Sequence, residues 1–167
     1  KKENGQNPIL NYIKNSNADI VCMQEYAGSE TAKIHLSNKE IRQALKDYPY
    51  HNIKQVGKTG AGSQLACYSK FPILSARMLD YRSNYNGSMV YEIKIGKDTV
   101  LLINNHLESN KLTREDKVVY EDMLKDPKAG KVKSGVRQLV NKLAEASAIR
   151  SAQARTIAQE IAHSPYP

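Results

Sequence analysis

Two groups of polar residues follow apolar segments and carry the side chains best suited to chemistry in this sequence. The first is Glu25, which directly follows the largely apolar run 20–24. A carboxylate at the carboxyl end of a buried strand lies where α/β sheets commonly bind ligands, and its hard oxygens suit Mg²⁺. The second group is Asn104, Asn105 and His106, which follow the apolar residues 100–103. These side chains can donate hydrogen bonds to a phosphate, and His106 can transfer a proton.

Each group alone is a weak functional signal. A glutamate at a strand end is usually a surface residue, and a histidine there is usually structural. The other histidines, His35, His51 and His163, have no neighbours in the sequence that indicate a site. Whether the two groups form one site depends on the helices and strands that position them.

The hydrophobic pattern predicts an α/β chain with much antiparallel pairing. Helices are expected over residues 7–16, 38–46, 113–125 and 134–163. The last would make about 45 Å of continuous helix, so we expect a break inside it. Ser37 and Glu40 are placed to form a capping box. Strands are expected over residues 20–24, 48–55, 64–69, 73–82, 88–95 and 99–104, with a hairpin loop at 96–98.

Composition indicates one globular domain with a positive net charge. The chain has 167 residues, of which 40% are hydrophobic and 25% charged, and its net charge is +8. A positive field favours phosphates, nucleic acid or lipid headgroups, although a solvated lysine-rich surface explains the charge equally well. The densest basic stretch holds Lys125, Lys128, Lys131 and Lys133. No apolar run approaches the ~18 residues of a membrane span.

The two cysteines show no metal-site spacing. Cys22 and Cys67 form no CxxC motif and lie within apolar stretches, so we predict two buried thiols. The sequence does not decide whether the two cysteines form a disulfide.

Four motifs, taken together and in order, resemble one known family. Asp-Ile-Val-Cys-Met-Gln-Glu at 19–25 resembles the metal-site strand of the endonuclease/exonuclease/phosphatase superfamily, which includes deoxyribonucleases, inositol polyphosphate phosphatases and sphingomyelinases. Residues 62–73 resemble its strand and S-K-x-P-I turn. Residues 104–107 resemble its N-x-H-L motif, and residues 150–153 its R-x-x-Q. The match covers residues 7–167.

This resemblance implies a magnesium-dependent phosphoesterase on an α/β (α+β) fold, the four-layer α/β/β/α sandwich of the deoxyribonuclease-like type, incomplete in this chain. Glu25 is then a ligand of Mg²⁺, with Mn²⁺ as an alternative metal. His106 is the expected catalytic residue, and Asn105 and Asn104 are expected to bind substrate. The implied partner is a phosphate ester in a nucleic acid, a sugar phosphate or a phospholipid headgroup. Arg150 and Gln153 are expected to support helix and loop packing.

Parts of the family pattern are missing, and this leaves other functions open. The chain has no first strand with an active-site Asn, no later Asp-x-Asn motif and no C-terminal Asp-His pair. We therefore expect residues 1–167 to be a single partial domain with little activity by itself. One alternative is a non-catalytic relative that binds anionic ligands or nucleic acid through a basic surface. Another is a basic nucleic-acid-binding module, although helix-turn-helix, zinc-finger and RNP signatures are absent.

Overall fold

The computed structural model describes residues 7–28, 36–57, 63–81, 83–125 and 130–167. Its internal contacts divide the chain into two compact units. The first unit comprises residues 1–106 and 161–167, and the second comprises residues 107–160. Each unit is considered by itself below. Of the basic stretch noted above, only Lys125 has a described side chain; Lys128, Lys131 and Lys133 lie outside the described side chains.

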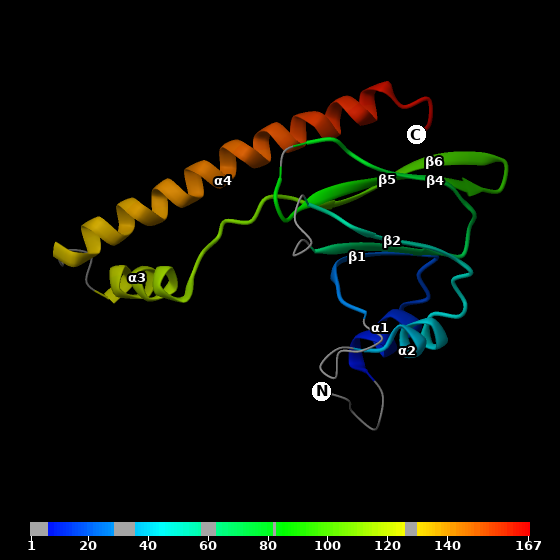
Figure 1. Cartoon of the computed structure of the whole chain (residues 1–167), viewed down its shortest axis with the longest axis horizontal. Coiled ribbons are helices and arrows are strands. Elements are labelled where there is room, and N and C mark those ends of the chain that lie inside the picture. The colour runs from blue at the N-terminus through cyan, green and yellow to red at the C-terminus, as the bar shows by residue number, and fades with distance from the viewer. Residues whose placement is uncertain (1–6, 29–35, 58–62, 82, 126–129) are drawn as a thin grey trace. The chain divides into compact units, whose positions relative to one another are not determined.

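Two antiparallel sheets of three strands form the centre of the first unit (Figure 1). One sheet has the order β1-β3-β2, formed by β1 (Ile20–Tyr26), β2 (Tyr50–Gln55) and β3 (Gln64–Ser69). The other has the order β4-β5-β6, formed by β4 (Ile73–Met78), β5 (Gly87–Ile95) and β6 (Asp98–His106). Every pair of neighbouring strands is antiparallel, as the sequence predicted.

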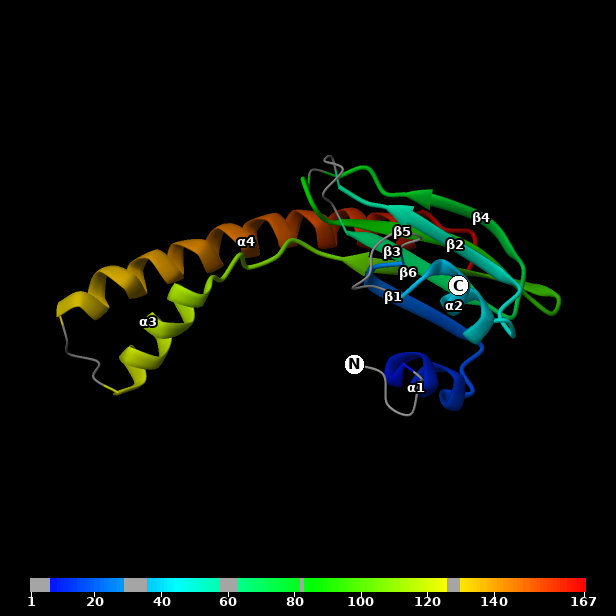
Figure 2. The ribbon, with the colours of Figure 1, turned by 60° about the horizontal axis from the view of Figure 1, so that its bottom comes forward.

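Two short helices cover the outer face of the β1-β3-β2 sheet (Figure 1 and Figure 2). Helix α1 (Pro8–Ser16) begins after Asn7, whose side chain accepts hydrogen bonds from two backbone amides of the first turn. Helix α2 (Asn38–Ala44) begins with the predicted capping box of Ser37 and Glu40. The helices and the sheet share one apolar cluster, built on Ile13, Ile41, Leu45, Tyr48, Ala66 and Tyr68.

A second apolar cluster lies between the two sheets. The β1-β3-β2 sheet and the end of β2 contribute Val56, Leu65 and Cys67, and β5 contributes Met89, Tyr91 and Ile93. Within the first unit the layers are therefore helix, sheet and sheet. The predicted α/β class with much antiparallel pairing is confirmed, and the structure divides the strands between two antiparallel sheets.

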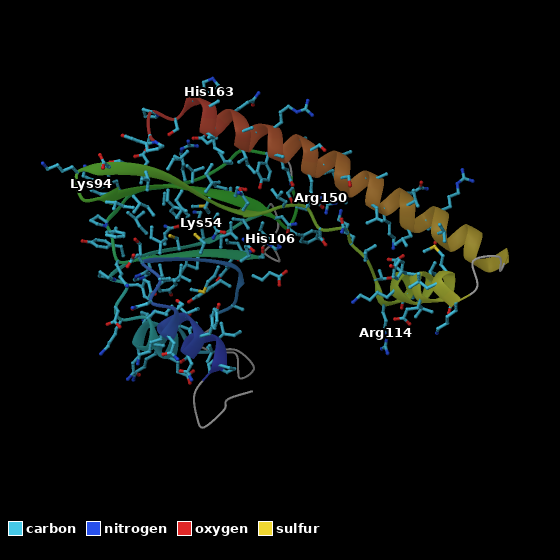
Figure 3. All side chains as sticks on the ribbon, turned by 180° about the vertical axis from the view of Figure 1, so that it is seen from behind. Lys54, Lys94, His106, Arg114, Arg150 and His163 are labelled. Atoms are coloured by element: carbon cyan, nitrogen blue, oxygen red, sulfur yellow. The ribbon has the colours of Figure 1, made fainter. Side chains whose placement is uncertain are left out.

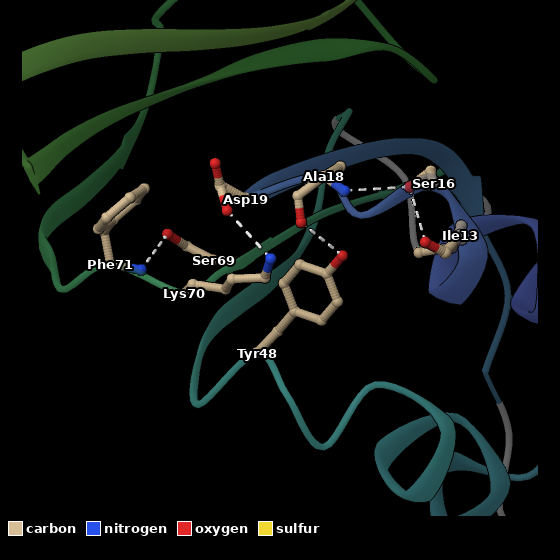
Figure 4. Close-up of polar contacts among 8 residues, drawn as sticks. All are labelled: Ile13, Ser16, Ala18, Asp19, Tyr48, Ser69, Lys70 and Phe71. Carbon is tan, nitrogen blue, oxygen red and sulfur yellow. Dashed lines mark hydrogen bonds and ion pairs between the residues drawn. The ribbon is translucent and has the colours of Figure 1, made fainter.

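Polar contacts hold the start of β1 in place (Figure 4). The Tyr48 hydroxyl donates a 2.8 Å hydrogen bond to the carbonyl oxygen of Ala18. The Lys70 ammonium lies 3.0 Å from a carboxylate oxygen of Asp19. These contacts connect the residues just before β1 to the residue that follows β3 and to Tyr48, which precedes β2. They help to position β1, at whose other end Glu25 lies.

The second unit contains α3 (Arg114–Lys125) and most of α4 (Gly130–His163). Asp116 accepts hydrogen bonds from the backbone amide of Thr113 and, at 2.6 Å, from Lys142 of α4. These two bonds hold the pKa of Asp116 below its usual value.

The expected break inside the last helix is wrong, because α4 is continuous over 34 residues. Gly135 fits there because a Cβ would lie 2.7 Å from the Val119 side chain of α3. Among the described helices, none is long and apolar enough to cross a membrane.

Two strand boundaries differ from the sequence prediction in a way that matters for the site. β1 continues beyond residue 24 to Tyr26, and β6 continues beyond Asn104 to His106. Glu25, Asn105 and His106 therefore belong to the strands and do not follow them. Pairing with β5 holds Asn104, Asn105 and His106 in the strand although their side chains are polar.

The core between the sheets provides a test of the fold with two matched leucines. Leu65 of β3 is fully buried, whereas Leu74 of β4 is 56% exposed. We expect Leu65→Ala to lower the free energy of unfolding by about 3 kcal/mol, through lost burial and the cavity that remains. Leu74→Ala should change it by less than about 0.5 kcal/mol. Urea denaturation followed by circular dichroism measures both, and equal effects would contradict the two-sheet core.

Candidate active site

A β-bulge in β1 directs Glu25 out of the sheet. Met23 pairs with Ala66 and Tyr26 pairs with Gln64, so that Gln24 and Glu25 both lie opposite Leu65. Two residues facing one define a bulge, which bends the strand and redirects its side chains. Glu25 takes a left-handed backbone conformation with φ of 52°, which is uncommon outside glycine. Its carboxylate is 78% exposed. The bulge therefore places a carboxylate at the surface at the end of a buried strand.

His106 meets Glu25 from the other sheet. Nε2 of His106 lies 3.7 Å from a carboxylate oxygen of Glu25, and the imidazole is 22% exposed. Figure 3 shows His106 at the end of the strands, and no hydrogen bond joins the two side chains at this separation. Both groups therefore keep capacity for a third partner placed between or beside them. The structure brings together the two residues that the sequence singled out.

Ser63 binds the opposite side of the imidazole. Its hydroxyl lies 2.8 Å from Nδ1 of His106. The backbone of Ser63 is held at both ends, because its amide donates to the Tyr85 carbonyl and its carbonyl accepts from the Val56 amide. Gly57 permits the close approach of the residue 84–85 backbone, since a Cβ there would lie 2.6 Å from the Asn84 carbonyl. With Nδ1 engaged, Nε2 is the ring nitrogen that faces Glu25.

Sequence reasoning did not single out Ser63. It lies 43 positions from His106 in a segment with the composition of a turn. A serine in such a segment is typical of loops, and nothing in its spacing indicates contact with a histidine. Only the pairing of the strands brings the two together.

Asn104 lies behind the bulge and joins both sheets. Its amide nitrogen donates 3.2 Å hydrogen bonds to the carbonyls of Met23 in β1 and Ala66 in β3. Its amide oxygen accepts a 3.4 Å hydrogen bond from Gln24. The residue is 2% exposed. The polar contacts of Asn104 are therefore internal and are made to the backbone from which Glu25 projects.

Asn105 points to the opposite face of β6. Side chains alternate along a strand, so Asn104 and His106 share a face and Asn105 does not. Its amide oxygen accepts a 2.5 Å hydrogen bond from Ser88, and Ser88 lies 2.6 Å from the hydroxyl of Tyr81. Asn105 thus ties β6 to β5 on the side away from Glu25.

Arg150 and Gln153 contact the loop that follows β6, all within the second unit. The Gln153 side chain accepts a 2.9 Å hydrogen bond from the Glu108 amide, and Arg150 donates to Asn110 and to Ser147. Gln153 is almost fully buried. These contacts agree with the expected packing role of both residues.

Glu25 fits one ligand position of a hard divalent cation. Mg²⁺ typically takes one or two protein carboxylates and fills its remaining positions with water and substrate oxygens. An exposed carboxylate with one neighbouring imidazole meets that requirement. Among the described residues, no group of three or more His, Cys, Asp or Glu side chains is placed to hold a metal. The fit therefore rests on Glu25 alone.

The chain belongs to the endonuclease/exonuclease/phosphatase family, whose model matches residues 3–163. This membership confirms the family that the motifs indicated. A comparison with curated protein sequences gave no match.

Two solved structures are similar to part of this chain. Truncated TDP2 from Caenorhabditis elegans is 22% identical over 72% of this chain and 49% of its own, with a TM-score of 0.43. SmcL is 12% identical over 80% of this chain and 60% of its own, with a TM-score of 0.42. The chain thus spans about half to three-fifths of these two proteins. The family match, and not these likenesses, supports the function proposed below.

Removing the Asn104 side chain tests the link behind the bulge. We expect Asn104→Ala to lower the free energy of unfolding by about 2–3 kcal/mol, because the buried Ala66 carbonyl and the part-buried Met23 carbonyl each lose a hydrogen bond. Asn15→Ala, at an exposed position of α1, serves as the matched control and should cost less than about 0.5 kcal/mol. Thermal or urea unfolding measures both. A mild effect at Asn104 would show that water replaces its hydrogen bonds.

The contact between Ser63 and His106 predicts the state of the imidazole ring. With the serine hydroxyl bonded to Nδ1, we expect one tautomer of neutral His106 to dominate. Ser63→Ala should abolish that preference, and Ser63→Thr should retain it because it keeps the hydroxyl. Long-range proton–nitrogen NMR correlations of the imidazole report the tautomer directly. Identical imidazole spectra in wild type and Ser63→Ala would show that the contact is not made in solution.

Proposed function

We propose that this chain forms part of a divalent-metal-dependent phosphoesterase domain, which hydrolyses a phosphodiester or a phosphomonoester. One observation carries the proposal. Glu25 from one sheet and His106 from the other face each other across 3.7 Å where the two sheets end. Membership of the family supports the hydrolase class. Because the chain spans only part of the solved relatives, the activity is proposed for the complete domain.

In this proposal Glu25 is a metal ligand, with Mg²⁺ as the expected ion and Mn²⁺ as an alternative. The metal, when bound, stabilises the negative charge that develops on the phosphoryl oxygens. The bulge holds the Glu25 carboxylate outward, and Asn104 fixes the backbone on which it stands. We therefore assign Asn104 a positioning role in place of the substrate contact expected from the sequence.

His106 is the proposed catalytic residue, and Nε2 is its reacting atom. Ser63 engages Nδ1, so the other nitrogen is directed to the side on which Glu25 lies. A protonated Nε2 donates a hydrogen bond to a phosphate oxygen, and a neutral Nε2 accepts a proton from the attacking water. Asn105 supports the end of β6 through Ser88 in this scheme, rather than contacting the same phosphate.

The proposed substrate is a phosphate ester in a nucleic acid, a sugar phosphate or a phospholipid headgroup. The net charge of +8 favours all three, because each carries negative charge. The described residues near Glu25 and His106 select none of them over the others.

The 167 residues alone are expected to turn over little substrate. The family resemblance calls for an Asp-x-Asn motif and an Asp-His pair to bind phosphate and activate water, and neither occurs in these residues. The segment is nevertheless expected to bind the metal weakly through Glu25.

Activity of the complete domain tests the proposal. We expect Mg²⁺-dependent hydrolysis of at least one substrate among a generic diester, a monoester, plasmid DNA and a sphingomyelin analogue. Glu25→Gln and His106→Ala should each lower kcat/KM on the order of 10²-fold or more, because each removes a group that stabilises the transition state. Glu121→Gln on α3 is the matched control and should match wild type.

Wild-type rates in the Glu25 and His106 variants would refute the site. No turnover by a folded complete domain on any substrate would favour the non-catalytic, anion-binding alternative. Metal binding can be separated from activity with Mn²⁺, which broadens NMR signals of nearby nuclei. Mn²⁺ should broaden signals around Glu25 in the 167-residue chain, and Glu25→Gln should remove that effect.

A further inference from the structure

The two cysteines of the chain lie directly opposite each other on neighbouring strands. Cys22 of β1 pairs with Cys67 of β3 in the antiparallel register. Both thiols are free. Cys67 belongs to the apolar cluster between the sheets and is fully buried, whereas Cys22 is exposed. The sequence prediction of two buried thiols is thus right for Cys67 and wrong for Cys22.

The backbone at this pair suits a disulfide without rearrangement. Directly opposite residues of an antiparallel pair have Cα atoms about 4.5–5.5 Å apart. Disulfides typically join Cα atoms about 4.4–6.8 Å apart. The register is regular from Ile20 to Met23, and the bulge begins only beyond Met23. The two side chains therefore project from the same face of a regular ladder.

The two thiols differ in reactivity because they differ in exposure and in their mutual contact. That contact lowers the pKa of Cys22. Contact with Cys22 and burial both raise the pKa of Cys67. The thiolate is the form that reacts with oxidants, and access also governs the reaction. Cys22 is therefore the thiol that reacts first with an oxidant from solvent. Cys67 lies beside it and can react in the second step.

We propose that Cys22 and Cys67 are a redox modification site, which forms a reversible intramolecular disulfide with a hydroperoxide as the oxidant. The Cys22 thiolate attacks the peroxide, so that one oxygen is transferred to sulfur and the alcohol or water leaves. The sulfenic acid of Cys22 is then attacked by Cys67 sulfur, the S–S bond forms, and one water leaves with the thiol proton. The peroxide is reduced by two electrons, and the two thiols supply them. A dithiol reductant reverses the reaction.

The bond would connect β1 to β3 just before the bulge that carries Glu25. It closes a loop between residues 22 and 67 and restricts the unfolded chain. The oxidised protein should therefore unfold at a higher temperature than the reduced protein, by roughly 5 °C. The inference stands on the strand register and on the exposure of Cys22, and it does not depend on the proposed hydrolase function.

Peptide mapping after mild oxidation tests the proposal. The reduced and desalted chain is treated with one equivalent of hydrogen peroxide, alkylated and digested with trypsin. We expect residues 15–33, which contain Cys22, to be linked to residues 59–70, which contain Cys67. Dithiothreitol should release both peptides. The control is the same treatment in 8 M urea, which unfolds the chain. Cys22 should then no longer be oxidised in preference to Cys67.

Two variants check the order of events. In Cys67→Ser, a sulfenic acid should persist on Cys22 and react with dimedone. In Cys22→Ser, Cys67 should stay a free thiol, at least 10-fold slower to alkylate than Cys22 in wild type. Circular dichroism of each variant shows whether it is folded. Disulfides between two chains, sulfinic acid on Cys22 beside a free Cys67 in wild type, or no reaction of either thiol would each overturn the proposal.

Discussion

The side-chain amide of Asn104 is the interaction on which the candidate site depends. It reaches from β6 to the carbonyls of Met23 and Ala66, and so joins one strand of the second sheet to two strands of the first. The site lies next to a bulge, where a ladder is locally disrupted and buried backbone groups need other partners. One side chain with two donors supplies them. An apolar residue of similar size at this position would remove one hydrogen bond from the buried Ala66 carbonyl and one from the part-buried Met23 carbonyl.

The bridge made by Asn104 also bears on the distance between Glu25 and His106. Because side chains alternate along a strand, His106 must lie on the same face as Asn104 and two residues further along. Glu25 lies two residues beyond Met23, in the strand to which Asn104 is bonded. The buried Asn104 amide and the two short segments, from Asn104 to His106 and from Met23 to Glu25, together bring the imidazole and the carboxylate to 3.7 Å. The left-handed backbone at Glu25 is tolerated because the pairs on either side of it are held in register.

Periodicity and turn chemistry predicted most elements of the fold from the sequence. The strand 64–69 and the Ser37–Glu40 capping box were predicted correctly, because alternation and cap spacing are local properties. The bulge at Glu25 was not predictable, since it depends on how β1 pairs with β3. The same holds for the Ser63–His106 contact and for the exposure of Cys22. The continuity of α4 was missed because its length alone suggested a break, whereas α3 packs closely against it, with the Val119 side chain next to Gly135.

The strand β1 combines two kinds of backbone, and each has its own consequence. From Ile20 to Met23 it pairs regularly with β3, so Cys22 stands directly opposite Cys67. Beyond Met23 it gains one extra residue, and the carboxylate of Glu25 turns outward. A bulge two residues earlier would shift the cysteine register and separate the thiols. Without a bulge, the Glu25 side chain would follow the regular alternation of side chains along the strand. Its backbone would then lack the left-handed conformation that accompanies the outward carboxylate. The position of this single insertion therefore determines both the thiol pair and the carboxylate that faces His106.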